Sequence, residues 1–576
     1  MAELRAHAAR TQASLLAVLR DDPTAVEALS IQSNWLGNFV QCRATPAAIL
    51  RAAALPSIDR VALDVAPALA EVADRADRVE SPAAVLAADA CLPPPSLPIP
   101  GDAAVFTRAF SVWNAGIRGQ GIVIANVDGG LTQHNDLDLR RWINLGEIPG
   151  NGLDDDQNGF IDDVHGFAFD LGTAQLDDGG GHGTMTAGLL VGDGSCSGIA
   201  YGQAPQAQVM TCRVLSETSH WNAVQYAIAM GADVQTSSFS YKASFVPPPD
   251  YRMHRDVATA SLAAGLIRCN SPGNDAVFAN DPTSAARVPL NIAAPACVPS
   301  PYRDPSQGPG GLSGVIAVGA LRVLQDQLDP ASPFGPFAWS LSDVQQNLPG
   351  YPTAAWDVAH HDDYAFAQGL AQGLLKPDVL GPTQTTTLTS GPCRVATFAG
   401  TSNATPCTAG TIALWKCANP SLTPEDAAML VHQTASDRGS IPGKENGYGA
   451  GLVDAERGFL RALCVHRVDF MSAWNVEHSI ASGPVHLAID GAVNSLAIVA
   501  VGYQRTPTPV GPLVLGIGPV VDIVFGGVTD SAGDLTASIP IGPWLQGQTL
   551  ATQAVLWDQV LTGRLLDSNV IEISFR

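Results

Sequence analysis

The sequence lacks any apolar run of the roughly 20 residues that a membrane-spanning helix requires, so no transmembrane segment is expected. Its first residues, Met1–Arg5, carry Glu and Arg where an export signal would need an apolar stretch, so no such signal is visible. Charged residues make up only 15% of the chain, against about 25% in typical soluble domains. The hydrophobic fraction of 46% is nevertheless that of a globular protein.

Positive charge is also scarce. The chain holds 31 Lys and Arg against 54 Asp and Glu, which gives a net charge of −23. Nucleic acids and anionic lipids are both bound mainly through Lys and Arg, so neither is expected as a partner. The acidic residues are spread along the chain rather than held in one tail, which indicates a solvated acidic surface with some cation sites.

Cysteine pairs with the C-x-x-C spacing of zinc sites are absent. The ten cysteines lie dispersed between Cys42 and Cys464. Disulfides in an exported enzyme and simple buried thiols both fit this distribution. A secreted or extracellular protein is the expectation, although no export signal is visible in this sequence.

The chain of 576 residues is longer than one hydrophobic core usually supports, and its pattern changes twice. Residues 1–98 combine a predicted helix at Pro46–Ala54 with a predicted strand at Trp35–Val40, and end in a Pro-rich linker. Residues 99–464 alternate apolar strands with helical patterns, as a parallel sheet with covering helices requires. Residues 465–576 hold strands separated by Gly, Pro and Asn turns. The predicted order is a small α+β domain, an α/β domain and an all-β, sandwich-like module.

Three glycine-rich segments place an acid, a base and a nucleophile in chain order. They are Asp128 in I-A-N-V-D-G-G, His182 in G-G-G-H-G-T-M-T-A-G, and Ser402 in F-A-G-T-S-N-A-T-P. A serine hydroxyl is too weakly acidic to attack an amide alone, so His182 would take its proton while Asp128 orients the imidazole. Ser402 also begins an apolar helical stretch, whose N-terminal amides favour negative charge. The order Asp, His, Ser differs from the His-Asp-Ser and Ser-Asp-His orders of other hydrolases.

These segments resemble the catalytic segments of the subtilisin-like serine peptidases, the subtilases. The resemblance extends to His134–Leu137, Lys376–Val379 and Gly447–Gly449. It implies a three-layer α/β fold with a mainly parallel sheet, preceded by a small α+β inhibitor prodomain. The implied function is that of a serine endopeptidase made as a self-processing zymogen, with polypeptides as substrates and its own prodomain as an intramolecular inhibitor. An unrelated α+β cap is the alternative for the N-terminal region.

The resemblance also assigns residues around the nucleophile. Asn274, in S-P-G-N-D, matches the segment that supplies a side-chain amide to the oxyanion of the tetrahedral intermediate. Asn270 is the competing asparagine, but it lacks the Gly-Asn context. Two segments are expected to line an extended peptide on opposite sides. Their residues are Ser238, Phe239, Ser240, Ser271 and Gly273.

Three positions depart from the subtilase pattern. Gly129 replaces the hydroxyl residue that usually follows the acid, Met185 replaces a frequent His, and Cys407 is a further replacement in the helix after Ser402. The loss of a hydroxyl beside Asp128 is expected to loosen the contacts of that carboxylate. None of the three departures removes a catalytic group.

An acidic stretch from Asp154 to Asp163 gives a second chemical signal. Oxygen ligands at alternate positions followed by a glycine begin an EF-hand-like calcium loop. His165 stands where the twelfth-position glutamate would be, so a full EF-hand is not predicted. The expected ligands of a shorter loop are Asp154, Asp156, Asn158, Asp162 and Asp163. The calcium would be structural, because the catalytic chemistry needs no cofactor; an ordinary acidic turn is the alternative.

Three other functions remain open on the sequence. An inactive subtilase-like scaffold would have lost a triad or oxyanion residue, whereas all four candidates are present. The protein could instead be an adhesive or binding protein whose main function lies in the C-terminal module, with proteolysis as a secondary function. Transpeptidation or macrocyclisation shares the acyl-enzyme intermediate with hydrolysis, so the residues alone do not separate them.

Overall fold

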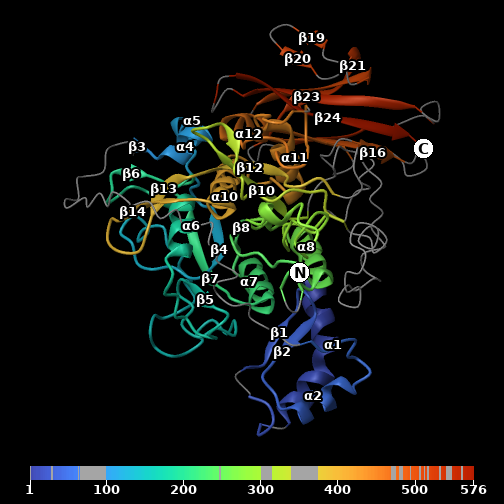
Figure 1. The fold of residues 1–576 in the computed structure, drawn as a ribbon. Helices are drawn as coiled ribbons and strands as arrows, with labels where there is room; N and C mark the ends of the chain where they lie inside the picture. Colours follow the sequence, from blue (N-terminus) through green and yellow to red (C-terminus); the bar gives the residue numbers. More distant parts are fainter. Residues whose placement is uncertain are drawn as a thin grey trace.

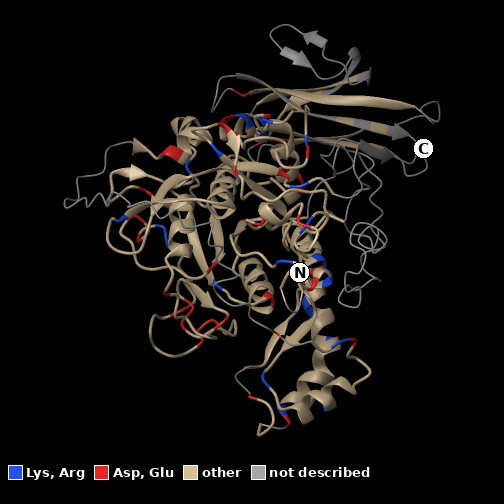
Figure 2. Ribbon diagram, in the orientation of Figure 1, with Lys and Arg blue, Asp and Glu red and all other residues tan. Residues whose placement is uncertain are grey.

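A computed structural model shows three parts arranged in chain order (Figure 1). It describes residues 2–64, 99–299, 314–338 and 374–468 and most of 475–575, with short gaps at 22, 28–29, 63, 246–247 and 441. Within these residues no helix is long and apolar enough to cross a membrane. Asp and Glu residues gather in the long connection between β4 (Val123–Asp128) and β5 (Gly166–Ala168) (Figure 2).

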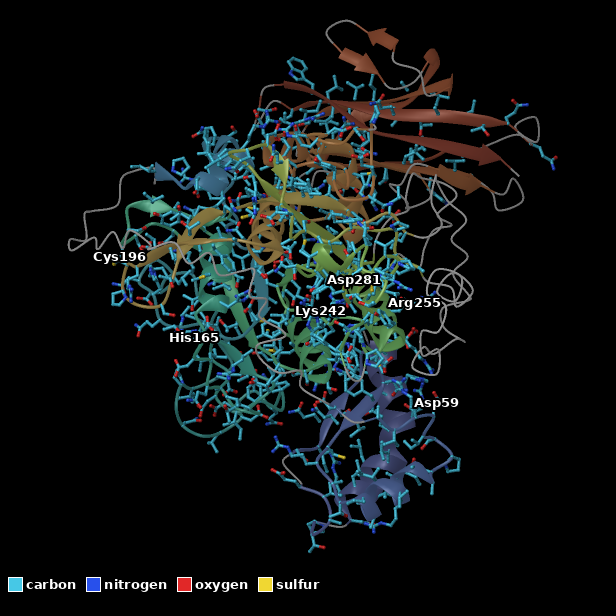
Figure 3. The ribbon with its side chains drawn as sticks, in the orientation of Figure 1. Asp59, His165, Cys196, Lys242, Arg255 and Asp281 are labelled. Atoms are coloured by element: carbon cyan, nitrogen blue, oxygen red, sulfur yellow. A yellow bond between two sulfur atoms is a disulfide. The ribbon has the colours of Figure 1, made fainter. Side chains whose placement is uncertain are left out.

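The N-terminal part packs two helices on a short hairpin. The elements are α1 (Ala2–Arg20), β1 (Gln32–Asn34), β2 (Phe39–Gln41) and α2 (Pro46–Ala53). Leu19, Val26, Ala48 and Ala52 form their small core. Asp59, near the described end of this part, pairs with Arg252 of the neighbouring domain at 3.2 Å (Figure 3).

The strand expected at Trp35–Val40 is wrong in its bounds. Residues 35–38 form the turn of the β1–β2 hairpin, and Asn38 takes a left-handed φ of 52° there. Gly37 and Asn38 are turn residues that the apolar run around them concealed. The helix expected at Pro46–Ala54 is present as α2, with Thr45 as its N-cap.

The central part is built on one mainly parallel sheet with the strand order β11-β10-β9-β8-β4-β7-β5, and β12 pairs with β10. Only the β10–β11 pair is antiparallel. The strands not yet given are β7 (Gln208–Arg213), β8 (Val234–Ser237), β9 (Ile267–Asn270), β10 (Ile316–Arg322), β11 (Gln327–Leu328) and β12 (Val379–Thr383). The predicted α/β class with a mainly parallel sheet is therefore confirmed.

Helices cover both faces of this sheet. Successive residues of β4 point to opposite sides: Ile124 packs in the cluster of α6 and α10, while Ala125 packs in the cluster of α7 and α8. The helices of the central part are α4 (Asp102–Phe106), α5 (Ala109–Asn114), α6 (His182–Val191), α7 (Glu217–Ala229), α8 (Tyr251–Ala263), α10 (Thr401–Ala418), α11 (Pro424–Thr434) and α12 (Ala455–Ala462). The result is a three-layer sandwich of helices, sheet and helices.

The described C-terminal residues form two larger sheets above the central part (Figure 1). Their strands are β15 (Cys464–Val468), β16 (Asn475–His478), β17 (Val485–Gly491), β18 (Leu496–Gln504), β19 (Thr508–Val510), β20 (Leu513–Leu515), β21 (Gly518–Val528), β22 (Asp534–Ile539), β23 (Thr549–Asp558) and β24 (Arg564–Phe575). Phe459 and Leu463 share one hydrophobic cluster with Leu566 and Ile571. The two parts therefore pack through a common apolar core.

A buried group of charges lies under the sheet where β12 begins. The Asp378 carboxylate accepts hydrogen bonds from Lys376 Nζ at 2.8 Å, Lys444 Nζ at 2.6 Å and Ala317 N at 2.7 Å. Burial opposes charge on Asp378, but the two ammonium groups outweigh it and hold the pKa of this carboxyl well below its usual range. Burial also lowers the pKa of Lys376 to about 8 and that of the neighbouring His432 to about 3.

We expect Asp378→Asn to lower the free energy of unfolding by about 3–5 kcal/mol, because two buried ammonium groups lose their counter-charge. The lowered pKa means that Asp378 stabilises the fold at pH values above its unfolded pKa of about 3.9, and that this stabilisation fades as the pH falls further. Below about pH 4, wild type should therefore lose stability more steeply than the variant.

Denaturant unfolding at neutral and acid pH would measure both effects. Asp326→Asn is the matched control, because the Asp326–Arg438 pair is exposed and its loss should cost less than about 1 kcal/mol. Equal losses in the two variants would contradict the role assigned to Asp378.

Candidate active site

Asp128 and His182 meet at the carboxyl edge of the parallel sheet. Asp128 is the last residue of β4 and is fully buried, and His182 is the first residue of α6. His182 Nδ1 lies 2.7 Å from Asp128 Oδ1. This contact fixes the tautomer of the imidazole, with the proton on Nδ1 and the Nε2 lone pair available to act as a base.

A backbone N–H and a hydroxyl contact the Asp128 carboxylate. Gly129 N donates to Oδ1 at 2.7 Å, and the Thr186 hydroxyl of α6 lies 3.4 Å from Oδ2. Thr186 is itself held by Asn126, whose Nδ2 donates to it at 3.1 Å. The Thr186 hydroxyl has a closer acceptor in Gly183 O at 2.9 Å, so Gly129 N is the main donor to Asp128 here and the expected effect of the missing hydroxyl stays a prediction. Thr186 lies four residues after His182, so the two side chains share one face of α6. This spacing could have indicated that Thr186 also lies near Asp128.

A second carboxylate, Asp178, supports the start of α6. Its Oδ2 accepts hydrogen bonds from Thr184 N at 2.8 Å and Thr184 Oγ1 at 3.0 Å. Burial raises the pKa of Asp178, and the nearby charge of Asp128 raises it further. Asp178 therefore fixes the first turn of the helix that carries the base.

The glycines around the acid and the base are required by close backbone approach. Gly130 has a φ of 118°, and a Cβ atom placed on Gly183 would lie 2.1 Å from the Gly130 carbonyl oxygen. No side chain fits at position 183, so the two segments could not approach this closely with any other residue.

Ser402 is the second residue of α10, two positions after the N-terminal cap at Gly400. In a regular helix the Ser402 carbonyl would accept a hydrogen bond from residue 406, but Pro406 has no N–H. Ser238 Oγ donates to this carbonyl instead, at 3.1 Å. The serine therefore sits at a helix N-terminus and is tied to the segment that follows β8.

Two aromatic rings join the base to the serine segment. The Phe398 ring, four residues before Ser402, lies edge-on to the His182 ring with the centroids 5.4 Å apart. The Phe239 ring lies 6.4 Å from His182, next to the Ser238 that bonds Ser402. The predicted acid, base and nucleophile are thus gathered around one group of side chains.

Asn274 is oriented by the residue that precedes the serine. Its Oδ1 accepts hydrogen bonds from Thr401 N at 2.9 Å and Thr401 Oγ1 at 3.0 Å. With the oxygen held, the Nδ2 hydrogens are the donating end of this amide beside Ser402. Asn270 differs, because its Nδ2 donates to Phe239 O and Ser271 O, each at 3.0 Å. The geometry favours Asn274 over Asn270 as the oxyanion donor.

The five predicted substrate-binding residues follow two adjacent parallel strands. Ser237 of β8 pairs with Asn270 of β9, so Ser238 and Ser271 leave the sheet side by side. Ser271 Oγ donates to Ser238 O at 3.1 Å, and both residues are buried. Gly273 has a φ of 95° and turns the chain towards Asn274. The structure places both segments beside Ser402, and peptide binding by them stays a prediction.

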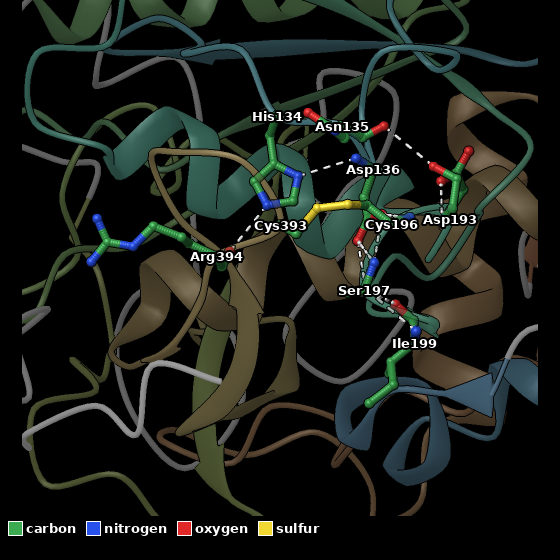
Figure 4. The surroundings of a disulfide bond; sticks show 10 residues. His134, Asn135, Asp136, Asp193, Cys196, Ser197, Ile199, Cys393 and Arg394 are labelled. Carbon is green, nitrogen blue, oxygen red and sulfur yellow. Dashed lines mark hydrogen bonds between the residues drawn. A yellow bond between two sulfur atoms is a disulfide. The ribbon is translucent and has the colours of Figure 1, made fainter. Parts of the chain in front are cut away.

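A disulfide fastens the hairpin that leads to the serine. Cys196, just after α6, is bonded to Cys393 in the turn between β13 (Thr385–Leu388) and β14 (Val395–Phe398) (Figure 4). His134 Nε2 contacts Arg394 O at 3.0 Å, next to this bond. The sequence left disulfides and buried thiols open, and the described residues contain both kinds of cysteine.

The acidic loop, residues 143–163, brings together a different carboxylate set from the predicted one. Glu147, Asp154 and Asp156 have carboxylate oxygens within 4.8 Å of one another. Asp162 faces away and accepts hydrogen bonds from Asn151 N and Gly152 N. The predicted ligand Asn158 donates its amide to Asp156 and Asp163.

Asp163 is used inside the protein. The Tyr226 hydroxyl donates to its Oδ2 at 2.5 Å and Asn144 Nδ2 to its Oδ1 at 3.0 Å. Glu147 was missed because it stands outside the alternating Asp pattern, seven residues before Asp154. Its carboxylate can hold a hard cation with Asp154 and Asp156, since such ions prefer oxygen ligands.

An imidazole hydrogen-bonded to a buried carboxylate, a serine at a helix start and a neighbouring amide are the groups that serine hydrolases use. Comparison with known families agrees with this class. The model of peptidase S8, the subtilase family, matches residues 119–451, which is more than half of the chain, and the chain belongs to that family.

One relative is the major intracellular serine protease of Bacillus subtilis strain 168, which is 27% identical over 176 residues. The match covers 29% of this chain and 47% of that protein, so the chain spans about half of the relative's length.

Replacing Asn274 by Ala should lower the turnover of a chromogenic peptide by about 10²- to 10³-fold, a range borrowed from the same kind of change in subtilisin. The Michaelis constant should change little, because the amide acts on charge that exists only in the transition state. Steady-state kinetics would separate the two constants. Asn270→Ala is the control and should mainly lower the melting temperature; a turnover defect in that variant alone would contradict the assignment.

Proposed function

We propose that this chain is a serine endopeptidase that hydrolyses peptide bonds through an acyl-enzyme. The observation that carries the proposal is the 2.7 Å contact of His182 with the buried Asp128, beside a serine held at the N-terminus of α10. Membership of the subtilase family supports it. No metal or organic cofactor takes part in the proposed steps.

The proposed reaction begins when His182 Nε2 removes the proton of Ser402 Oγ, which attacks the carbonyl carbon of the scissile bond. Asn274 Nδ2 and backbone N–H groups at the start of α10 stabilise the oxyanion that forms. His182 then gives its proton to the leaving amine, and the C–N bond breaks. Water, deprotonated by His182, releases the acyl group and restores Ser402.

The substrates are proposed to be polypeptides in extended form. Residues 238–240 and 271–273 leave two neighbouring parallel strands next to the serine, and backbone groups in such segments can pair with an extended peptide. Pairing through backbone atoms makes little demand on sequence. An inactive scaffold is disfavoured, because every group that the reaction needs is present. Mass analysis of the products would distinguish hydrolysis from ligation.

The N-terminal part is proposed to be an intramolecular inhibitor, because it docks on α7 through buried amide groups. Gln225 Oε1 accepts hydrogen bonds from Trp35 N at 2.5 Å and Leu36 N at 3.1 Å. Asn34, fully buried, donates to Asn222 Oδ1 at 3.0 Å. Leu36 packs in the same cluster as the core of the central domain. A cap joined this closely is held in one orientation.

Beyond this hairpin the chain runs towards the catalytic edge. Arg60 pairs with Asp250, the N-cap of α8, and Asp64 accepts a hydrogen bond from Ser216, the N-cap of α7, at 3.0 Å. The chain is next described at Ile99–Pro100, which pair as β3 with β6 (Ile199–Ala200). A processing site therefore fits between residues 64 and 99, before the chain joins the central domain. The Pro-rich linker in this interval lies outside the described residues.

Ser402→Ala should abolish hydrolysis of a casein substrate and leave the chain at full length, while wild type loses roughly its first 98 residues by self-cleavage. Removal of the serine in subtilisin costs about 10⁶-fold in turnover, and a loss of that order is expected here. Gel analysis with N-terminal sequencing would follow the cleavage. Ser390→Ala, a change in the hairpin turn, is the control and should behave as wild type.

Two results would contradict these proposals separately. A Ser402→Ala protein with even a tenth of wild-type activity would exclude Ser402 as the nucleophile. Full activity of uncut wild type would instead exclude the inhibitor role and leave the N-terminal part as a structural cap.

Calcium is proposed to bind in the acidic loop in a structural role, with Glu147, Asp154 and Asp156 as the carboxylate ligands. The support is the convergence of these three groups within 4.8 Å.

Export from the cell is also proposed, because the Cys196–Cys393 disulfide suits an oxidising compartment. The similar Bacillus subtilis protein, by contrast, is named an intracellular protease.

Removing calcium with a chelator should lower the melting temperature of wild type, because an ion bound only by the folded state adds stability with its concentration, about 2.7 kcal/mol at 100 times its dissociation constant. Glu147→Gln should remove most of this response. Asp162→Asn is the matched control and should keep it. If the Asp162 variant loses the response and the Glu147 variant keeps it, the ligand set read from the sequence is the better one.

A further inference from the structure

The acidic loop exposes an unusual number of large aliphatic side chains. Among the described residues, five of the seventeen exposed large hydrophobic side chains lie within residues 143–163. Leu145 is 92% exposed, Ile148 and Leu153 are each 61% exposed, and Ile161 is 51% exposed. Single exposed aliphatic residues are ordinary on a protein surface, but a group of them in one loop marks an interaction site.

These side chains are not required by the core beneath the loop. Phe160 anchors the loop from within, where its ring packs against Phe167, Phe169 and Tyr226 at centroid distances of 4.8, 5.6 and 5.1 Å. The loop thus has an inner aromatic contact and an outer set of aliphatic residues. The outer set has no described packing partner that explains its apolar character.

Hydrogen bonds from backbone N–H groups to carboxylates fix the loop that carries the aliphatic residues. Ile148 N donates to Asp155 at 3.1 Å, and Gly152 N, beside Leu153, donates to Asp162, beside Ile161, at 3.0 Å. Glu147 links two further parts of the loop, because its carboxylate accepts hydrogen bonds from Asp155 N at 3.0 Å and Asp162 N at 3.1 Å. A surface fixed in this way loses little conformational freedom when a partner binds.

The charge of the loop selects the kind of partner. Residues 143–163 contain six acidic residues and no Lys, Arg or His. Figure 2 shows this stretch as a dense group of acidic residues at the edge of the central domain, and His165, labelled in Figure 3, lies just past its end. Carboxylates among exposed aliphatic side chains repel anionic lipid and complement a partner that is both apolar and cationic.

We propose that the acidic loop is a docking surface for a basic amphipathic polypeptide, one in which Leu, Ile or Val alternate with Lys or Arg. The aliphatic side chains bury the apolar residues of the partner. Glu147, Asp154 and Asp156 are kept for the proposed calcium and Asp163 for Tyr226, so Asp155 and Asp162 are the carboxylates that pair with the cations of the partner. A peptidase with such a surface concentrates basic protein partners at a place apart from its catalytic edge.

The test uses the full chain with Ser402→Ala, so that the probe is not cut and the result does not depend on the proposed catalysis. The probe is a fluorescein-labelled peptide of alternating Leu and Lys, titrated in the presence of calcium and followed by fluorescence anisotropy. We expect saturable binding that weakens by at least about tenfold between low salt and about 1 M salt, where charges are screened over about 3 Å. A peptide of alternating Leu and Glu should not bind.

Leu145→Ser with Ile148→Ser should raise the dissociation constant of the Leu-Lys peptide by at least about tenfold. Leu324→Ser is the matched control, because Leu324 is 79% exposed in a distant turn after β10, and it should leave binding unchanged. Leu153→Ser with Ile161→Ser provides a second variant should the first fail to fold.

Three results would overturn the proposal. They are the absence of saturable binding, equal loss of binding in the Leu324 control, and equal binding of the Glu peptide. Binding of anionic vesicles in preference to the Leu-Lys peptide would also overturn it and would identify the surface as one for membranes.

Discussion

The parallel register of the central sheet determines where the groups of the active site lie. Val127 of β4 pairs with Ser237 of β8, and Ser237 pairs with Asn270 of β9. Asp128, Ser238 and Ser271 therefore leave three neighbouring strands at the same level of one edge. The carboxyl ends of parallel strands are the usual place for such sites, because the loops that leave them are free to vary while the strands stay fixed.

The helices that enter this edge bring chemistry that the strands cannot. His182 and Ser402 each stand in the first turn of a helix, after a glycine with a positive φ. The helix N-terminus favours negative charge, which suits a serine that would form an oxyanion beside it. It disfavours a charged imidazolium at His182, so the buried Asp128 carboxylate is the group that offsets this effect. Pro406 has no N–H to donate to the Ser402 carbonyl, so Ser238 Oγ can donate to that carbonyl instead.

Local patterns in the sequence were sufficient for the parts of the fold that local chemistry controls. The alternation of strands and helices and helix α2 could be predicted from periodicity, and the Asp128, His182 and Ser402 segments from their chain order and their resemblance to the subtilases. Thr186 and Glu147 could not, because their roles depend on which segments the fold brings beside them. The hairpin turn at residues 35–38 was missed because apolar residues surround Gly37 and Asn38. Asn274 was preferred to Asn270 on its Gly-Asn context, and the folded chain adds the partners of each amide, which the sequence does not show.

The disulfide has a consequence if the proposed activity cuts other copies of the chain. Cys196 and Cys393 are 197 positions apart, and the interval holds the strand ends that flank the nucleophile as well as Asn274. Asp128 and His182 precede this covalent ring, and Ser402 follows it. Any single peptide bond cut inside the ring would leave both fragments joined through sulfur. A cut of this kind breaks the chain near Asn274 but does not release either fragment. A molecule that has been cut once can therefore stay in one piece.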